Sequence, residues 1–496
     1  MRRVLVITLV AVLVLCGGGT ALAGWMWSRT AISTVGDVDF TRPLAIPPLA
    51  ASHVDEQGRR VFDLRAAAGT TDFGRGGPTR TWGYSGGYLG PTLRASRGEK
   101  VLINVHNGLD EETTVHWHGM HLPASMDGGP HQPIRPDATW SPTWTIDQPA
   151  ATLWYHPHPH GETEFHVYRG LAGMFILDDP AASALPLPHR YGFDDIPLIV
   201  QDKRFDGAQF GERSSVLGSL GILGDTVLVN GTVGPYLDVS TERVRLRILN
   251  ASNARTFNFG LADDRSFAIV ATDGGLLPAP VVERRVQLAP GERAEIILTV
   301  RPHERVVLRG YPADLGTNFI MERLSGGDDT FDVLEVRAAA TLRPSADVPS
   351  SLVDVPRIDP AESVRTRFFD LADESINGAE MSMRRVDAVV TKDTVETWEI
   401  RNRDGFPHTF HVHDVQFQVL SIDGDQPPLY LRGWKDTVYA VPNAAVRIIA
   451  RFTDYADPQS PYMFHCHMLR HEDGGMMGQF VVVEPGQRPA LTHRHR

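Results

Sequence analysis

This chain has almost no cysteine. Its 496 residues include only Cys16 and Cys466, and Cys16 lies in an N-terminal segment with an explanation of its own, so a disulfide scaffold is excluded. Stability must therefore come from sources other than disulfides, chiefly from packing. The chain also lacks an excess of positive charge: its net charge is −12, which disfavours nucleic acid as a partner and fits a soluble protein that meets cations or neutral molecules.

Helical periodicity is scarce as well. Apolar and other residues alternate instead, as in residues 101–105, 244–248 and 446–452, and this pattern predicts half-buried antiparallel strands. Turn signals such as Asp127-Gly128-Gly129 recur between them. The length suits about three domains of ordinary size, so we expect an all-β protein built of consecutive sandwich or barrel domains.

The first 30 residues predict export. Arginines at positions 2 and 3 precede an apolar run that reaches Cys16, and a small-residue end follows at residues 21–23, which is the order of a signal peptide. Residues 24–27 prolong the apolar span to about 24 residues, enough to cross a bilayer. Cleavage and retention as a membrane anchor are therefore both open, and we expect a periplasmic, cell-surface, secreted or membrane-anchored protein.

Four His-x-His pairs are the most informative pattern in the chain: His116/His118, His156/His158, His411/His413 and His465/His467. In a strand, successive side chains point to opposite faces, so each pair presents two imidazoles on one face. Eight imidazoles are too many for one ion of four to six ligands. The pairs therefore predict a cluster of metal ions, and imidazole suits copper, zinc, iron or nickel.

Cys466, between His465 and His467, predicts a second metal site. A blue copper centre needs a thiolate, two histidines and a weak axial methionine. His471 and Met476 follow Cys466 at short spacings, and His408 can supply the second imidazole. Because alternate strand residues face opposite ways, Cys466 would face this copper while its two neighbours face the cluster, on the order of 10 Å away.

An internal repeat relates the beginning and the end of the chain. "LINVHNGLDEETTVHWHG" parallels "WEIRNRDGFPHTFHVHD", and Pro157 stands where the later block has Cys466, so a duplicated fold is implied. The middle of the chain has Phe257 and Phe259 where imidazoles would be. We expect a first domain over residues 45–180 with two His pairs, a copper-free second domain over 190–337, and a third over 355–487 with the other two pairs and the blue copper.

The motifs "HWHGMHLP", "WYHPHPHG", "HTFHVH" and "HCHMLRHEDGGMMG" resemble those of the multicopper oxidases, which are laccase-like enzymes. "GDTVLVNG", "ATDGGLLPAP" and "RGWKDTV" are similar to the bacterial copper-efflux oxidases of that family. The resemblance implies three cupredoxin-like Greek-key domains and four copper ions. It makes His408, Cys466, His471 and Met476 the type 1 ligands, and His116 with His411 the type 2 ligands. It assigns the type 3 pair to the remaining six histidines, which are His118, His156, His158, His413, His465 and His467.

The same resemblance implies single-electron oxidation of a donor at type 1 copper and four-electron reduction of dioxygen to water at the cluster. It makes Asp127 and Glu472 candidates for proton delivery, although Asp127 can simply begin a turn and Glu472 can be a solvated loop charge. Asp404 and Asp473 lie close in sequence to His408 and His471. They are candidates for guiding a cationic donor, with salt bridging as the alternative.

The donor is less determined than the metal sites. Copper-efflux oxidases usually carry a methionine-rich insert in the last domain, where this chain has only Met381 and Met383. A more open type 1 edge favours phenols or other organic donors, with cuprous or other metal ions as an alternative. A non-catalytic cupredoxin and a copper nitrite reductase are rival interpretations, but twelve occupied ligand positions and four His pairs argue against them. We expect a monomer.

Overall fold

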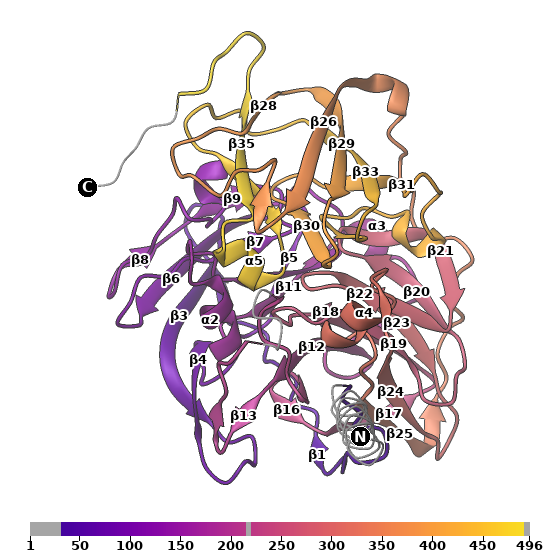
Figure 1. Ribbon diagram of the computed structural model, residues 1–496. Coiled ribbons are helices and arrows are strands. Elements are labelled where there is room, and N and C mark those ends of the chain that lie inside the picture. The colour runs from indigo at the N-terminus through magenta and orange to yellow at the C-terminus, as the bar shows by residue number, and fades with distance from the viewer. Residues whose placement is uncertain (1–30, 215–219, 491–496) are drawn as a thin grey trace, which may run out of the picture.

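The computed structural model describes residues 31–214 and 220–490. The predicted export segment, residues 1–30 with Cys16, lies outside this part. Within the part described, no helix is both long and apolar enough to pass through a membrane. Figure 1 shows the three domains in chain order, with the first in indigo and purple, the second in magenta and rose, and the third in orange and yellow above the other two.

The first domain packs two sheets against each other. One has the order β2-β3-β6-β8, with β4 and β9 paired to it, and the other has the order β5-β11-β10-β7. The strands are β2 (Ser52–Val54), β3 (Arg60–Thr71), β4 (Thr79–Tyr84), β5 (Leu93–Ser96), β6 (Lys100–Gly108), β7 (His116–His118), β8 (Thr139–Trp140), β9 (Thr143–Thr145), β10 (Ala151–His156) and β11 (Gly173–Asp178). Strand β6 alternates buried and partly exposed residues, as its sequence pattern predicts.

The second domain has a six-stranded and a seven-stranded sheet, β1-β17-β25-β24-β19-β22 and β16-β15-β12-β18-β23-β20-β21. Its strands are β12 (Asp195–Lys203), β15 (Thr226–Val229), β16 (Thr232–Val233), β17 (Pro235–Thr241), β18 (Arg243–Asn250), β19 (Phe257–Leu261), β20 (Phe267–Thr272), β21 (Gly275–Glu283), β22 (Arg285–Leu288), β23 (Arg293–Thr299), β24 (Arg305–Tyr311) and β25 (Phe331–Arg343). Strand β1 (Arg42–Pro43) pairs with β17, so the start of the described chain packs on the second domain. A small hairpin, β13 (Phe205–Asp206) with β14 (Gln209–Phe210), stands apart.

The third domain repeats the two-sheet arrangement, with orders β27-β26-β29-β33-β31 and β28-β35-β34-β30-β32. Its strands are β26 (Ser363–Ala372), β27 (Ser375–Ile376), β28 (Ala388–Thr391), β29 (Thr394–Asn402), β30 (His408–Val412), β31 (Phe417–Ile422), β32 (Thr437–Ala440), β33 (Ala445–Phe452), β34 (Tyr462–Cys466) and β35 (Met477–Val483). Helices are short: η1 (Ala124–Met126), α2 (Thr163–Arg169), α3 (Pro180–Ser183), α4 (Phe319–Leu324), η3 (Pro360–Glu362), η4 (Leu429–Leu431) and α5 (Leu469–Asp473).

Each domain has its own buried apolar cluster between its two sheets. Phe62 and Trp117 belong to the first, Phe257 and Leu246 to the second, and Trp398 to the third. Three separate cores agree with the predicted three-part chain, and the prediction of an all-β fold is confirmed. The first and third domains meet at the histidine pairs on and beside β7, β10, β30 and β34. Helix α2 lies below α5 where these two domains meet (Figure 1).

Candidate metal centres

The four histidine pairs lie on two strand pairs, one in the first domain and one in the third. Strand β7 pairs with β10 so that His116 lies opposite His156, and β30 pairs with β34 so that His411 lies opposite His465. All eight rings are buried, with at most 1% of their surface exposed. A wholly buried group of eight imidazoles, without metal, would leave polar nitrogens unsatisfied.

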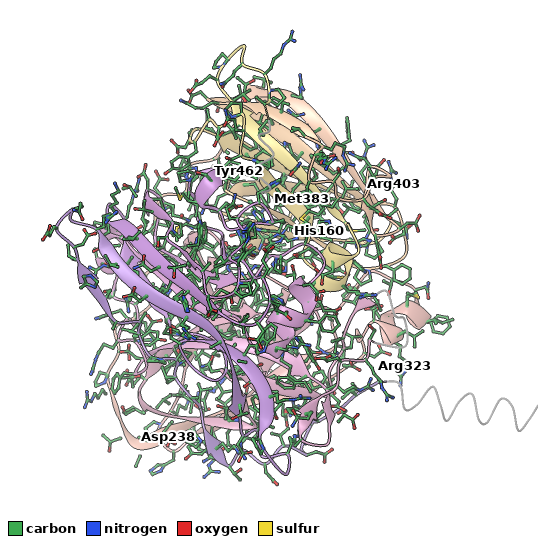
Figure 2. The ribbon with its side chains drawn as sticks, turned by 90° about the vertical axis from the view of Figure 1, so that its left-hand side faces the viewer. His160, Asp238, Arg323, Met383, Arg403 and Tyr462 are labelled. Carbon is green, nitrogen blue, oxygen red and sulfur yellow. The ribbon has the colours of Figure 1, made fainter. Side chains whose placement is uncertain are left out.

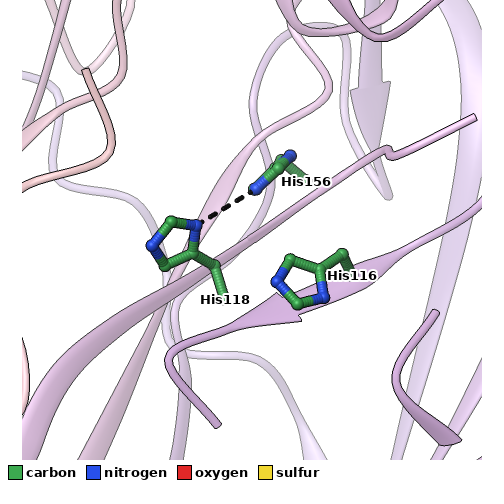
Figure 3. A group of neighbouring side chains, drawn as sticks. All are labelled: His116, His118 and His156. Carbon is green, nitrogen blue, oxygen red and sulfur yellow. Dashed lines mark hydrogen bonds between the residues drawn. The ribbon is translucent and has the colours of Figure 1, made fainter. Parts of the chain in front are cut away.

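Their nitrogens converge in three groups. In the first, His118 Nδ1 lies 3.4 Å from His156 Nε2 and 3.2 Å from His467 Nε2. Figure 3 shows His118 and His156 facing each other across this gap, with His116 beside them.

In the second group, His465 Nε2 lies 3.2 Å from His158 Nε2 and 3.3 Å from His413 Nε2. In the third, the Nε2 atoms of His116 and His411 are 3.5 Å apart.

These separations fit metal coordination. Two nitrogens about 2.0 Å from one ion, at a tetrahedral angle, are about 3.3 Å apart. Both imidazole triads and the imidazole pair have this spacing, and within each group the atoms come from both the first and the third domain. The donor set is therefore suited to three ions held between two domains.

Cys466 lies on the other side of β34. Its Sγ is 3.6 Å from His408 Nδ1 and 3.5 Å from His471 Nδ1, and these two nitrogens are 3.0 Å apart. A thiolate and two imidazoles around one ion would have similar spacings, since metal–sulfur bonds are about 2.3 Å long. Met476 is fully buried and belongs to the same apolar cluster as Cys466. As expected, Cys466 faces one side of the chain, while His465 and His467 face the histidine groups on the other.

The charges of this second site favour a thiolate. Burial raises the pKa of the Cys466 thiol, but His471 and His408 have the larger effect and lower it to about 5. Burial lowers the pKa of His408, whereas hydrogen bonds to Asp404 and Cys466 raise it, to about 9. A deprotonated sulfur is the form that binds metal.

Three buried carboxylates each lie between a histidine of the first domain and one of the third. Asp127 lies 2.7 Å from His413 Nδ1 and 3.3 Å from His116 Nδ1. Glu472 lies 3.1 Å from the Nδ1 atoms of both His158 and His465. The alternative interpretation of Glu472 as a solvated charge is wrong, because its side chain is 1% exposed.

Asp436 is the third carboxylate, and sequence reasoning missed it. Its Oδ1 lies 3.1 Å from His118 Nε2, and its backbone oxygen accepts a hydrogen bond of 2.8 Å from His411 Nδ1. The residue stands in "RGWKDTV", which resembles a family segment, but nothing in the spacing marks its carboxylate as a partner of histidines. Only the pairing of β32 with β30 brings it there.

The pKa values of the three carboxylates shift in different directions. Burial raises the pKa of Asp127, but His413 and His116 lower it far below its usual value. Burial likewise raises the pKa of Glu472, and His158 and His465 lower it to about 2. Burial raises the pKa of Asp436, with Arg293 opposing that effect.

Comparison with known proteins gives the family. Multicopper oxidase family models match residues 66–182, 210–306 and 348–486. The chain belongs to the multicopper oxidase family. The three matched segments follow the three-domain order, and the predicted family and cupredoxin-like fold are confirmed.

This multicopper oxidase has curated relatives of similar length. It is 36% identical over 445 residues to multicopper oxidase mco of Staphylococcus haemolyticus, covering 89% of this chain and 92% of that protein. It is 36% identical over 449 residues to the cell division protein FtsP of Escherichia coli, covering 89% and 93%. A solved laccase-like oxidase, CueO from Ochrobactrum sp., superposes with a TM-score of 0.81 at 35% identity, covering 89% of this chain and all of that one.

Family membership makes the protein a copper-dependent oxidoreductase, with dioxygen and a reducing donor as its partners. The groups of metal-binding side chains found among residues 31–214 and 220–490 all come from the first and third domains. At the corresponding place in the second domain, Phe257 and Phe259 stack with ring centroids 5.2 Å apart inside the apolar core.

The two remaining predicted carboxylates of this oxidase have different surroundings. Asp404 accepts a hydrogen bond of 3.2 Å from His408 Nε2, and its side chain is 20% exposed. It therefore joins the buried Cys466 site to the surface. Asp473 instead accepts hydrogen bonds of 2.9 Å from the backbone N–H groups of Thr163 and Glu164, the first residues of α2, an arrangement that sequence reasoning did not anticipate.

Proposed function

We propose that this protein is a laccase-type oxidase with four copper ions, which couples one-electron oxidation of phenolic or other small organic donors to reduction of dioxygen to water. The observation that supports this most is the position of Cys466 on β34, with Sγ near two imidazole nitrogens on one face and the cluster histidines His465 and His467 on the other. A single strand thereby links an electron-accepting site to a dioxygen-reducing one.

In this proposal, the type 1 ligands are His408, Cys466, His471 and Met476. The type 2 ligands are His116 and His411. The type 3 ligands are His118, His156 and His467 for one ion, and His158, His413 and His465 for the other. When bound, the copper ions take up electrons one at a time and deliver four to each dioxygen, which consumes four protons and yields two waters.

The chain supplies orientation and protons. Each Nδ1–H of His413 and His465 points at a carboxylate, Asp127 or Glu472, which directs Nε2 of the ring toward the ion. We propose that the same two carboxylates pass protons to the oxygen-reducing site. Their burial between the histidines keeps bulk water away from it.

The donor would approach near Asp404, the partly exposed carboxylate on His408 Nε2. Met381 and Met383, the only methionines in the region of the family's insert, lie half-buried, so no methionine-rich insert covers this edge. Organic donors are therefore favoured, and the Ochrobactrum relative is described as active towards lignin model compounds. Cuprous or other metal ions are the second candidate, because the Asp404 carboxylate would attract a cation.

The relationship to FtsP raises a non-catalytic alternative. Against it stands the complete set of twelve ligand side chains, all of them buried. We further propose that the protein is exported, as its N-terminal sequence predicts, and that it acts as a monomer.

The decisive experiment is copper analysis with visible and spin-resonance spectra of the wild type and of Cys466→Ser, with dioxygen uptake on a dimethoxyphenol and on cuprous ion. We expect about four copper ions in the wild type and about three in the variant, because the cluster ligands lie on the other face of β34 and are unchanged. The variant should lose the blue band, and it should lose dioxygen uptake because no electrons reach the cluster. Met477→Leu, a change in a neighbouring buried methionine, should retain both. A single kind of copper in the wild type would refute the four-copper proposal, and a lack of phenol oxidation would refute the laccase proposal.

A further inference from the structure

The described residues of the second domain belong to none of the groups of metal-binding side chains, yet the loop between its strands β22 and β23 reaches the histidine cluster. Gly291, in this loop, has φ +85, and a Cβ atom there would lie 3.0 to 3.2 Å from the ring atoms of His467. Glycine is thus the residue that lets the loop backbone approach the ring so closely. Arg293 follows two residues later at the start of β23.

Arg293 is fully buried and uses all five of its N–H groups. Its Nε donates to Thr152 O in the first domain, at 2.9 Å, while Nη1 and Nη2 donate to the backbone oxygens of Gly291 and Asp273, at 3.0 Å each. The remaining two N–H groups bind both carboxylate oxygens of Asp436 in the third domain, at 2.7 and 2.6 Å. One guanidinium therefore joins all three domains.

The Asp436 carboxylate has no freedom to rotate under this two-point contact. Its Oδ1 also lies 3.1 Å from His118 Nε2 and accepts a hydrogen bond of 2.8 Å from Thr437 Oγ1, which itself lies 3.0 Å from the same nitrogen of His118. Occupying Nε2 of His118 leaves Nδ1 as the nitrogen that faces His156 and His467. The ring nitrogen that binds metal is set by the hydrogen bond that the other nitrogen makes.

Resting on the proposed four-copper function, we propose that Arg293 is a positioning residue for the cluster: it fixes Asp436 so that His118 binds through Nδ1. The second domain is then a working part of the metal centre. Without the guanidinium, Asp436 would be a buried carboxylate with its strongest partner removed, free to turn away from His118 or to draw in water.

The test compares Arg293→Lys with Arg255→Lys. Lysine keeps the charge but cannot bind both oxygens of a carboxylate. Arg255 is a matched control because it is equally buried in the second domain and binds Asp202, Asp329 and the oxygen of Gly224, away from the histidines. For each fully loaded protein, the chelator concentration that removes half of the cluster copper is measured, with the blue band of the Cys466 site as an internal standard.

We expect Arg293→Lys to release cluster copper at a chelator concentration about tenfold or more below that of the wild type, while its blue band stays unchanged. Arg255→Lys should release cluster copper as the wild type does, even if its melting temperature falls. Equal release by the two variants would overturn the proposal. A wild type that binds a single copper would instead refute the proposed function, which keeps the two failures apart.

Arg293→Lys can fail to fold, so a second variant is needed. The double change Arg293→Met with Asp436→Asn removes both charges at nearly constant volume, and such neutral replacements of buried ion pairs are often tolerated. It should melt near the wild-type temperature and still release cluster copper at a lower chelator concentration, because the two-point contact with the guanidinium no longer fixes the new amide beside His118. Unchanged release from this folded protein would also overturn the proposal.

Discussion

At the scale of single residues, three buried carboxylates support the histidines that could hold metal. Asp127, Glu472 and Asp436 each lie between one histidine of the first domain and one of the third. A carboxylate on one ring nitrogen fixes the ring and its tautomer, so that the other nitrogen is free for an ion. Each carboxylate also joins two domains, so the same three contacts orient ligands and hold the seam together.

Asp404 gives a prediction about the donor. Asp404→Asn keeps an oxygen for His408 Nε2 but removes a negative charge from the partly exposed edge of the Cys466 site. A charge about 6 Å away in water is worth roughly 0.7 kcal/mol, so KM for cuprous ion should rise about threefold. KM for an uncharged dimethoxyphenol should stay within about twofold of the wild type on the same basis.

Steady-state dioxygen uptake on both donors measures this difference. Asp238→Asn is the control, because Asp238 is exposed on the second domain and lies at the far end of the molecule from the third (Figure 2). It should change neither KM. An equal rise of KM for both donors in Asp404→Asn would mean that the residue acts on the copper site itself rather than on the charge of the donor.

At the scale of secondary structure, most of the correct predictions came from the alternation of side chains along strands. Two-residue alternation in residues 465–467 was enough to put Cys466 opposite its neighbours, because the period of a strand is fixed by backbone geometry. Asp436 and Arg293 were not predicted, because their roles depend on side-chain contacts between domains, and no local pattern in the sequence indicates those. The fold class followed from periodicity and the histidine groups from motif spacing, whereas the carboxylate partner of His118 came only from the packing of β32 beside β30.

Helix α2 gives a second example of long-range dependence. Its N-cap residue, Glu162, makes no capping hydrogen bond from its side chain, and Asp473 of α5 accepts the first two N–H groups instead. Free N–H groups at a helix start need such partners. Asp473 belongs to the same short helix as His471 and Glu472, so this contact also holds α5 against the first domain.

Asp473→Ala should therefore loosen α2. Losing a capping carboxylate costs about 0.5–2 kcal/mol, so we expect a lower melting temperature and faster amide hydrogen exchange over residues 163–169. Asp179→Ala is a matched control, because Asp179 caps α3 within the first domain through Ala182 N, at 2.6 Å. It should cost similar stability without changing exchange in α2. Unchanged exchange over α2 in Asp473→Ala would show that the cap is not needed.

At the scale of the whole molecule, a buried network of ion pairs in the second domain forms a seam with the first domain through Thr152. Arg247 and Arg245 of the second domain bind Glu295, and Thr152 of the first domain donates to the same carboxylate at 2.6 Å. Arg247 also binds Asp195. Working with the metal-free protein separates the contribution of this seam to stability from that of copper.

The seam predicts a dependence of stability on pH. Burial raises the pKa of Glu295, but Arg245 and Arg247 lower it below its usual 4.5, to about 2. A carboxylate with a lowered folded-state pKa stabilises the fold at pH values above 4.5, and that contribution is lost as the pH falls from about 4.5 towards 2. Glu295→Gln lacks the titrating group, so its own contribution is constant over this range.

We therefore expect the copper-free variant Glu295→Gln to melt well below the wild type at pH 7, because two buried arginines lose a partner, a change that typically costs about 3–5 kcal/mol. The gap in melting temperature should narrow as the pH is lowered from 5 to about 3. Glu283→Gln, a change at an exposed position of the second domain, should follow the wild-type curve throughout. A gap that stays constant with pH would mean that Glu295 is protonated in the folded protein and that the arginines at this seam are balanced by Asp195 alone.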